Sequence, residues 1–315
     1  MAVFTPLSTD RVASFLARYE LGALQSVADV HGGTENSTFF VATEGEVLVL
    51  TLFEQGGADE LPFFVDLLKH LADKGLPVPG PLVDRQGVAL QTLAGKPALL
   101  FPRLPGRFPM QPTVAQCTEI GRFLGKMHQS VHDFTSTREN LRDHRWVNAN
   151  YHRVLPFLSP EERTLMETQV QALSTAIAQS PDLPRGAIHG DLFRDNTLFE
   201  GDRLGGIIDF YNGCIGDFLF DLSIVINDWC SDEHGELIHA RYDAVVQAYH
   251  QERPFTAQER DFWPVMLRFT ALRYWLSRLL VVHVDTPAHN LTPKPPAQYH
   301  DLLVARCTTP PPALP

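Results

Sequence analysis

Cysteine and positive charge are both scarce in this sequence. The 315 residues include four cysteines, and no Cys-x-x-Cys pair is present. This argues against a disulfide scaffold or a zinc ribbon and favours a reducing compartment. Lysine and arginine number 26 against 37 aspartates and glutamates, a formal net charge of −11. Binding to nucleic acids or anionic membranes relies on Lys and Arg side chains that neutralise phosphates, so we expect no nucleic-acid partner and no membrane partner.

Long apolar runs and a secretory signal are missing as well. The most apolar stretch, residues 276–284, is interrupted by Ser277, Arg278 and His283, whereas a membrane span needs about 20 apolar residues. The first residues, MAVFTPLSTDR, lack the basic region and apolar run of a secretory signal. We therefore expect a cytoplasmic protein.

What the sequence does contain is the composition of a globular protein. Hydrophobic residues make up 44% and charged residues 20%, a mix that is typical of a chain with a substantial core. Disorder of the whole chain is excluded. The length indicates about two domains or one large domain with two lobes.

The hydrophobic pattern predicts a sheet-rich N-terminal part with little helix. A short helix is predicted over 11–19 and a second over 61–74, closed by Gly75. Residues from about 28 to 54 have the pattern of strands, beginning with a Gly-Gly turn at 32–33. The predicted strands are 37–42, 47–53, 88–92 and 98–102.

The remainder of the chain is predicted to be mainly helical. Thr113 can cap a first helix. Further helical segments are 161–179, a region from 220 onward, and the long apolar stretch 261–283. Two short strands, 196–199 and 204–210, interrupt the helices. The tail from 292 is rich in proline and is expected to be extended or partly disordered.

These patterns together predict an α+β fold. It has an antiparallel-sheet N-lobe with one helix between its strands, and a mainly helical C-lobe that contains one small hairpin. We place the lobes at residues 1–100 and 108–291, with a hinge at 101–107 and a tail at 292–315.

The predicted hairpin carries the residues that phosphoryl transfer from ATP needs. That reaction requires a carboxylate to orient the acceptor hydroxyl and take its proton, and oxygen ligands to hold Mg²⁺ on the phosphates. In the stretch His189-Gly190-Asp191-Leu192-Phe193-Arg194-Asp195-Asn196, Asp191 lies in a loop after a short strand. Asn196 begins the next strand, and Asp209 ends the strand after it. The hairpin returns Asp209 to the neighbourhood of Asn196, so we predict Asp191 as base and the other two as magnesium ligands.

An alternative is that Asp191 and Asp195 are simply turn residues and that His189 is a structural histidine. For His189 we prefer that interpretation, with the ring bracing the loop. For the set of Asp191, Asn196 and Asp209 we favour the functional one, because an Asp that closes a second apolar strand makes coincidence improbable.

The stretches HGDLFRDN and IIDF resemble the kinase-like phosphotransferases of the aminoglycoside phosphotransferase and choline kinase superfamily. The resemblance implies a protein-kinase-like fold with the nucleotide between the lobes. It also implies the same three roles for Asp191, Asn196 and Asp209. It further implies that Asp221, in Phe-Asp-Leu, braces the catalytic loop. The stretches GTENSTFFV, DFYN and INDWC are similar to the bacterial homoserine kinase branch.

Nucleotide contacts are expected in the N-lobe. The Gly-Gly turn lets backbone N–H groups approach phosphate oxygens, so Gly33, Asn36 and Ser37 are candidates, although such a turn can be an ordinary hairpin. Kinases of this fold usually carry a Lys on the strand after the Gly-rich hairpin. Here Thr51 occupies the position of that Lys and is a further candidate for a nucleotide contact. Arg103, near the hinge, is a candidate for the missing phosphate cation, and a solvated arginine is the alternative.

The spacing of the residues does not fix the acceptor, and the resemblance implies a small amino alcohol. A zwitterion such as homoserine needs a cation for its carboxylate, and Arg194 and Arg273 are candidates. For Arg273 the alternative is a salt bridge within the acid-rich C-lobe, and for Arg194 it is a side chain that faces solvent. Tyr211 and Trp229 are predicted walls of the pocket, with a place in the core as their alternative.

The sequence thus predicts an ATP- and Mg²⁺-dependent kinase that phosphorylates the hydroxyl of homoserine for threonine synthesis. Choline, ethanolamine, methylthioribose and aminoglycosides stay open as acceptors. A catalytically silent nucleotide-binding module is a further alternative, although the predicted base and metal ligands are all present. The oligomeric state cannot be predicted from the sequence.

Overall fold

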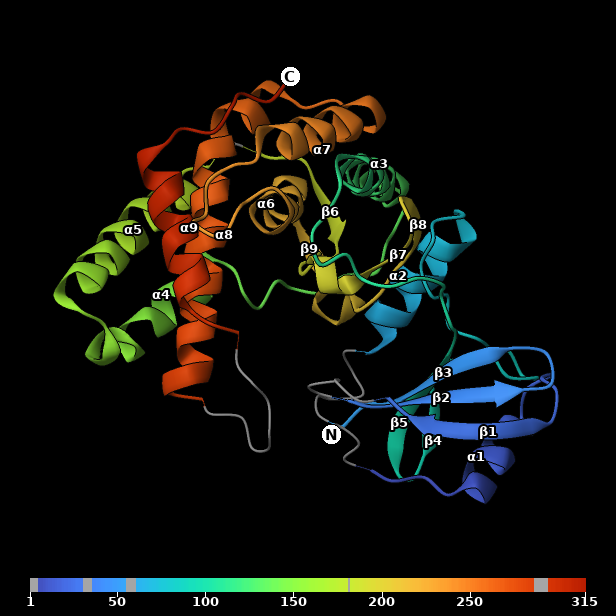
Figure 1. Cartoon of the computed structure of the whole chain (residues 1–315). Coiled ribbons are helices and arrows are strands. Elements are labelled where there is room, and N and C mark those ends of the chain that lie inside the picture. Colours follow the sequence, from blue (N-terminus) through green and yellow to red (C-terminus); the bar gives the residue numbers. More distant parts are fainter. Residues whose placement is uncertain (1–4, 31–35, 55–60, 181, 286–293) are drawn as a thin grey trace. The chain divides into compact units, whose positions relative to one another are not determined.

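The computed structural model of the chain describes residues 5–30, 36–54, 61–180, 182–285 and 294–315 (Figure 1). It divides into two compact units. The first holds residues 1–106 together with 205–208, and the second holds 107–204 together with 209–315. The predicted Gly-Gly turn and Gly33 lie outside the described residues. The predicted lobe, hinge and tail boundaries stay predictions.

The first unit is built on a five-stranded antiparallel sheet with the strand order β1-β2-β3-β5-β4. Its strands are β1 (Leu24–Asp29), β2 (Ser37–Thr43), β3 (Val47–Leu52), β4 (Gln91–Leu93) and β5 (Lys96–Pro102). The helices of this unit are α1 (Thr9–Leu16) and α2 (Leu61–Asp73). The predicted helices and most of the predicted strands are confirmed.

One face of this sheet forms a core with α1. Alternate residues of a strand point to the same face, which places Leu48, Leu50 and Leu52 together on this side of β3. Phe15 of α1 and Phe39 of β2 pack into the same cluster. The predicted strand region begins at about residue 28 and so misses most of β1. β1 is an edge strand that pairs with β2, and because none of its residues is buried, its sequence lacks a clear hydrophobic pattern.

The second unit is mainly helical. Its helices are α3 (Val114–Ser130), α4 (His144–Asn150), α5 (Pro160–Ala178), α6 (Phe218–Trp229), α7 (His239–Glu252), α8 (Ala257–His283) and α9 (Ala297–Thr308). Two short ladders accompany them: β6 (Arg185–Ile188) pairs with β9 (Cys214–Asp217), and β7 (Thr197–Glu200) pairs with β8 (Arg203–Ile207). None of the helices in the described ranges is long and apolar enough to cross a membrane.

Local chemistry explains where these helices begin and how they pack. Thr113 caps α3 in a capping box with Gln116, which confirms the predicted cap. α3 then packs closely on α7 because it carries glycines at the contact. A Cβ at Gly121 would lie 2.3 Å from the carbonyl oxygen of Val245, so any other residue there would separate the two helices.

The prediction of an extended or partly disordered tail was wrong. α9 occupies residues 297–308 and lies alongside α8 (Figure 1). Proline cannot continue a helix from its interior but is compatible with its first turn, and the prolines of the tail lie before and after α9. The helix is fixed by buried apolar side chains such as Leu302 and Leu303.

Two details of the predicted hairpin also differ. β8 ends at Ile207, so Asp209 lies outside the strand in the left-handed conformation, with φ 65° and ψ 56°. A single 3-10 turn, Phe210–Asn212, follows it. Asn196 likewise precedes β7 and ends the 3-10 turn Arg194–Asn196. Both residues therefore lie in turns, whose irregular backbone positions their side chains.

Candidate active site

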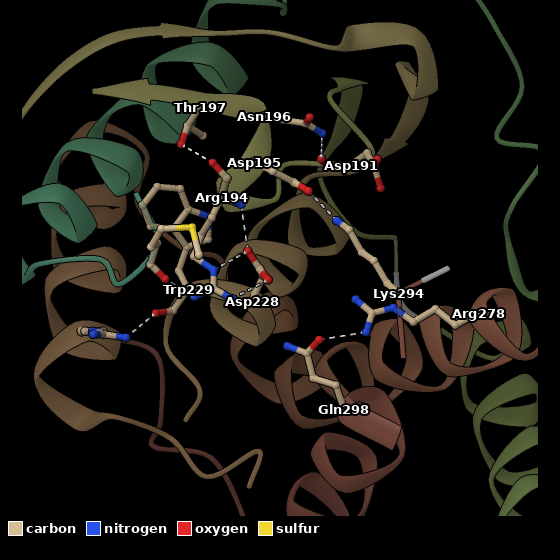
Figure 2. A network of polar contacts seen from close by, with 12 residues as sticks. Asp191, Arg194, Asp195, Asn196, Thr197, Asp228, Trp229, Arg278, Lys294 and Gln298 are labelled. Carbon is tan, nitrogen blue, oxygen red and sulfur yellow. Dashed lines mark hydrogen bonds and ion pairs between the residues drawn. The ribbon is translucent and has the colours of Figure 1, made fainter. Parts of the chain in front are cut away.

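Asp191 lies in the loop between β6 and β7, where three hydrogen bonds hold its side chain and backbone. The hydroxyl of Tyr274, on α8, donates to Oδ1 of Asp191 over 2.7 Å. The amide nitrogen of Asn196 donates to the backbone carbonyl of Asp191 over 2.8 Å (Figure 2). The backbone N–H of Asp191 donates to Nδ1 of His189 over 3.2 Å. The carboxylate is half-buried, and Oδ2 lies outside this set of bonds.

The turn that carries Asp209 packs directly against this loop. Gly190 has φ 76°, and a Cβ there would lie 2.7 Å from the carbonyl oxygen of Asn212, so the two backbones touch only because this residue is glycine. The ring of Phe210, next to Asp209, lies 4.4 Å from the ring of fully buried His189, centroid to centroid. The structure thus brings the loops of Asp191, Asn196 and Asp209 together.

The donor set in these two loops suits a hard cation. The nitrogen of the Asn196 amide is engaged by Asp191, so its oxygen is the atom available to a metal. A carboxylate and an amide oxygen are the ligands that Mg²⁺ takes in phosphoryl-transfer sites, where substrate phosphates and waters complete the coordination. Asn196 and Asp209 therefore fit the predicted ion.

Asp221, on α6, is hydrogen-bonded to the loop of residues 189–196, called the catalytic loop after its predicted role. Its two carboxylate oxygens accept the backbone N–H groups of His189 and Gly190, each over 2.8 Å. His128 contributes Nε2 at 3.3 Å. Burial alone would raise the pKa of the Asp221 carboxyl, but its hydrogen bonds with the His128 ring and with the backbone N–H of His189 bring that pKa below its ordinary value. Asp221 therefore stays ionised and fixes the loop backbone, the arrangement that the predicted bracing role requires.

His128 in turn is kept neutral by its surroundings. Burial lowers its pKa more than Asp221 raises it. The hydroxyl of Tyr249 lies 2.8 Å from Nδ1, and Arg253 donates to that same hydroxyl over 3.0 Å. A buried chain of hydrogen bonds thus runs from α7 through α3 to the catalytic loop.

Arg194, a predicted substrate residue, is engaged within the protein. Its backbone N–H and its Nε donate to Oδ2 of Asp228 over 2.8 and 3.1 Å (Figure 2). Its Nη1 donates to the carbonyl of Met110. Burial raises the pKa of Asp228, and Arg194 opposes that shift. The pair joins the catalytic loop to α6.

The other predicted substrate residues lie at different depths. Trp229 is fully buried, with its ring 6.0 Å from that of Phe199, centroid to centroid, so it offers no accessible surface to a ligand. Tyr211 lies in the turn after Asp209, and its carbonyl accepts from Nη1 of Arg138 over 2.6 Å. Arg273 is buried with its guanidinium 4.0 Å above the centroid of the Tyr274 ring.

Sequence reasoning did not identify Tyr274 or Lys294. Lys294 forms an ion pair with Asp195 at 2.5 Å (Figure 2), and its Nζ lies 5.1 Å from the ring centroid of Phe193. Both residues are far along the chain from the loop they contact. No local motif marks them.

In the first unit, the candidates beside the Gly-Gly turn are joined to Glu54. The hydroxyl of Ser37 donates to Glu54 over 2.5 Å, and the amide oxygen of Asn36 accepts the backbone N–H of Glu54 over 3.4 Å. Lys96 forms an ion pair with the same carboxylate. Although burial acts to raise the pKa of Glu54, the hydrogen bonds of Lys96 and Ser37 bring it below its ordinary value.

Strand register shows which cation shares the sheet face of Thr51. Phe40 pairs with Val49, and Val49 with Phe101. The guanidinium of Arg103 lies 4.3 Å above the ring centroid of Phe40. Because side chains alternate between faces, Arg103 lies on the face to which Thr51 also belongs. Lys96 falls on the opposite, α1-packed face by the same alternation.

Sequence comparison connects the chain with one family. The model of the phosphotransferase enzyme family matches residues 26–255. A homoserine kinase of Pseudomonas aeruginosa (strain LESB58) is 46% identical over 280 residues, 89% of each chain. That of Polaromonas naphthalenivorans (strain CJ2) is 42% identical, covering 98% of this chain and 99% of the relative. That of Janthinobacterium sp. (strain Marseille) is 39% identical, covering 99% and 98%.

Solved structures share the fold at low sequence identity. The amicoumacin kinase hAmiN, in complex with AMP-PNP, Ca²⁺ and Ami, has a TM-score of 0.70 and 16% identity, covering 96% of this chain and 92% of its own. The microcompartment-associated aminopropanol kinase has a TM-score of 0.67 and 18% identity, with coverages of 95% and 94%. These likenesses confirm the predicted α+β, protein-kinase-like fold class.

Proposed function

The chain belongs to the phosphotransferase enzyme family, and from this premise we propose that it transfers the terminal phosphoryl group of ATP to the side-chain hydroxyl of L-homoserine. The product is O-phospho-L-homoserine, an intermediate of threonine biosynthesis. The observation that carries the proposal is the similarity to homoserine kinases at 39–46% identity over 89–99% of the chain. That similarity extends through the helical unit in which Asp191 lies.

The alternative acceptors have weaker support. The structural neighbours named for amicoumacin, aminopropanol and choline or ethanolamine are 16–19% identical to this chain. At that level of identity they show the shared fold and do not identify the acceptor. A silent nucleotide-binding module is disfavoured because the base and both metal ligands of the predicted set are retained.

Asp191 performs the proton transfer in the proposed mechanism. Tyr274 occupies Oδ1, so Oδ2 accepts the hydrogen bond of the homoserine hydroxyl and aims its oxygen at the γ-phosphorus. As the new O–P bond forms, the bond between the γ-phosphorus and the β–γ bridging oxygen breaks, ADP leaves, and the hydroxyl proton passes to Asp191. Orienting the hydroxyl is the main contribution of a base in this reaction class.

Asn196 and Asp209 would hold Mg²⁺ in the proposed enzyme. When bound, the ion neutralises the charge that develops on the transferred phosphoryl group and on the leaving phosphate. Arg103 is the proposed protein cation for the phosphates, because it lies on the sheet face where Thr51 replaces the usual Lys. Support for a nucleotide and a divalent cation comes also from the hAmiN complex with AMP-PNP and Ca²⁺.

The test is ATP turnover by the purified chain with Mg²⁺ and a panel of acceptors. Homoserine is compared with choline, ethanolamine, methylthioribose and kanamycin. We expect ADP release that depends on homoserine and falls at least a thousandfold in Asp191→Asn. Turnover with another acceptor alone would overturn the choice of substrate. Unchanged turnover in Asp191→Asn would overturn the assigned base.

A further inference from the structure

Arg273 is a buried charge without a protein partner among the described residues. Its side chain is 5% exposed. Its Nε is buried and has no hydrogen-bond partner. The interaction found for its guanidinium is the contact with the ring of Tyr274. An arginine cannot escape the cost of burial by losing its proton, so an unpaired guanidinium in the interior calls for an anion from outside the chain.

Comparable arginines of the same region are satisfied by the protein. On α8, Nε of Arg268 donates to the carbonyl of Pro264 over 3.3 Å. Also on α8, Nη1 of Arg278 donates to Gln298 over 2.8 Å and to the carbonyl of Pro295 over 3.0 Å. In the catalytic loop, Arg194 is paired with Asp228. Arg273 differs from these three because it is more deeply buried and forms no hydrogen bond or ion pair within the ranges that the structure describes.

A second unsatisfied donor lies beside the same tyrosine. The hydroxyl of Tyr299, on α9, is buried, and no described residue forms a hydrogen bond with it. The Tyr299 ring packs 5.4 Å from the ring of Tyr274, centroid to centroid. Burial raises the pKa of Tyr299 well above its ordinary value, so its hydroxyl keeps its proton. Arg273 and Tyr299 both contact Tyr274, whose own hydroxyl is bonded to Asp191.

We propose that Arg273, with Tyr299, binds the carboxylate of the acceptor and so restricts the enzyme to hydroxy acids. The inference rests on the proposed function in one respect: it assumes that the hydroxyl of the acceptor binds at Asp191. A carboxylate is an acceptor-only group with two oxygens, which suits a planar guanidinium and a phenol hydroxyl. Homoserine carries its hydroxyl two carbons beyond the α-carbon. Its carboxylate must therefore lie close to Asp191. Arg273 is close as well, because its guanidinium lies over the ring of Tyr274, whose hydroxyl is bonded to Asp191.

The discriminating experiment compares two acceptors that differ in the carboxylate. 3-Aminopropan-1-ol is homoserine without that group. We expect Arg273→Met to lower kcat/KM for homoserine on the order of a hundredfold, the loss of one charge-assisted interaction. Turnover of 3-aminopropan-1-ol should change less than threefold. Arg268→Met, the same substitution on the same helix, should leave both values within twofold. Tyr299→Phe should shift the preference in the same direction by a smaller factor.

A binding measurement on the unmodified enzyme keeps the inference testable if the variant folds poorly. 4-Hydroxybutyrate retains the carboxylate and the hydroxyl of homoserine and lacks the amine. We expect it to raise the thermal midpoint of the wild-type protein, and 3-aminopropan-1-ol at equal concentration to raise it less. No shift with 4-hydroxybutyrate would overturn the inference, as would equal losses for both acceptors in Arg273→Met. Failure of the proposed function would be recognised differently, because the wild-type enzyme would then not turn over homoserine.

Discussion

The hydroxyl of Tyr274 donates to Oδ1 of Asp191 over 2.7 Å, although 83 positions separate the two residues in the chain. Burial raises the pKa of Tyr274 well above its ordinary value, so the phenol remains a donor at any working pH. One carboxylate oxygen is thereby fixed. In the proposed mechanism the other oxygen receives the acceptor hydroxyl, and Tyr274 acts through Asp191 as a positioning residue.

Replacing Tyr274 by Phe should slow phosphoryl transfer without weakening acceptor binding. The ring and its packing against Phe193 stay in place, while the carboxylate of Asp191 loses its fixed orientation. We expect kcat to fall about ten- to a hundredfold, with KM for homoserine within twofold. Steady-state kinetics over both substrates gives the answer. Tyr19→Phe is the control, because the buried Tyr19 hydroxyl has no hydrogen-bond partner among the residues with described positions. A rise in KM with unchanged kcat would contradict the positioning role.

The sequence was sufficient for the parts of the fold that depend on local pattern. The Thr113 cap of α3 and the strand patterns of β2 and β3 are local signals, and these elements are confirmed. The loop with Asp191 and Asn196 was identified from spacing, and its resemblance to a known family is confirmed at the level of the family. Their roles, and that of Asp209, stay predictions.

Features that depend on distant contacts could not be predicted. Tyr274 is one aromatic residue in an apolar helix, and its bond to Asp191 arises from how α8 packs on the catalytic loop. α9 was missed because its prolines suggest an extended chain. The helix forms between them, where Leu302 and Leu303 find a place in the core. Arg194 looked exposed in its loop, and its partner Asp228 lies on α6.

Asp209 offers a test of the proposed metal ligands. Asp209→Asn keeps the size of the side chain and removes one negative charge, so Mg²⁺ should bind more weakly and stabilise the reaction less. We expect kcat to fall on the order of a hundred- to a thousandfold and the Mg²⁺ concentration for half-maximal rate to rise. A magnesium titration of ATP turnover measures both. Asp202→Asn, on the same hairpin and bonded to Thr113, should change neither. An unaltered magnesium dependence in Asp209→Asn would remove Asp209 from the ligand set.

The buried His128 predicts a pH dependence of stability. Burial lowers its pKa from the ordinary value of 6.5, so below about pH 6.5 the unfolded chain binds a proton that the folded chain excludes. The free energy of unfolding should therefore be highest above this value and decrease as the pH falls from it toward the lower folded-state pKa. Urea unfolding between pH 5 and pH 8 measures the slope.

The matched comparison for this slope is between a buried and an exposed histidine. His128→Gln removes the titration while keeping a donor and an acceptor for Asp221 and Tyr249, so part of the slope should disappear. His132→Gln, at a side chain that is 75% exposed, should leave the slope unchanged. Identical slopes in both variants would show that His128 does not control this transition.

Arg306 predicts how strongly α9 depends on one side chain. Its guanidinium donates to Asn227 over 3.0 Å, to the carbonyl of Gly235 over 2.8 Å and to Ser231 over 2.6 Å. Arg306→Met would leave the buried acceptors of Asn227 and Gly235 without their donor. We expect the free energy of unfolding to fall by about 2–6 kcal/mol, since each of these two unsatisfied buried groups costs about 1–3 kcal/mol.

The control for Arg306 is an arginine with an exposed contact to the end of the chain. Arg260 donates from Nε to the carbonyl of Pro315 over 2.7 Å at the surface, so Arg260→Met should cost less than about 0.5 kcal/mol. Because α9 also supplies Tyr299, loosening it by Arg306→Met should raise KM for homoserine more than it lowers kcat. A destabilised variant with normal KM would separate the anchoring of α9 from acceptor binding and would place Tyr299 outside the acceptor site.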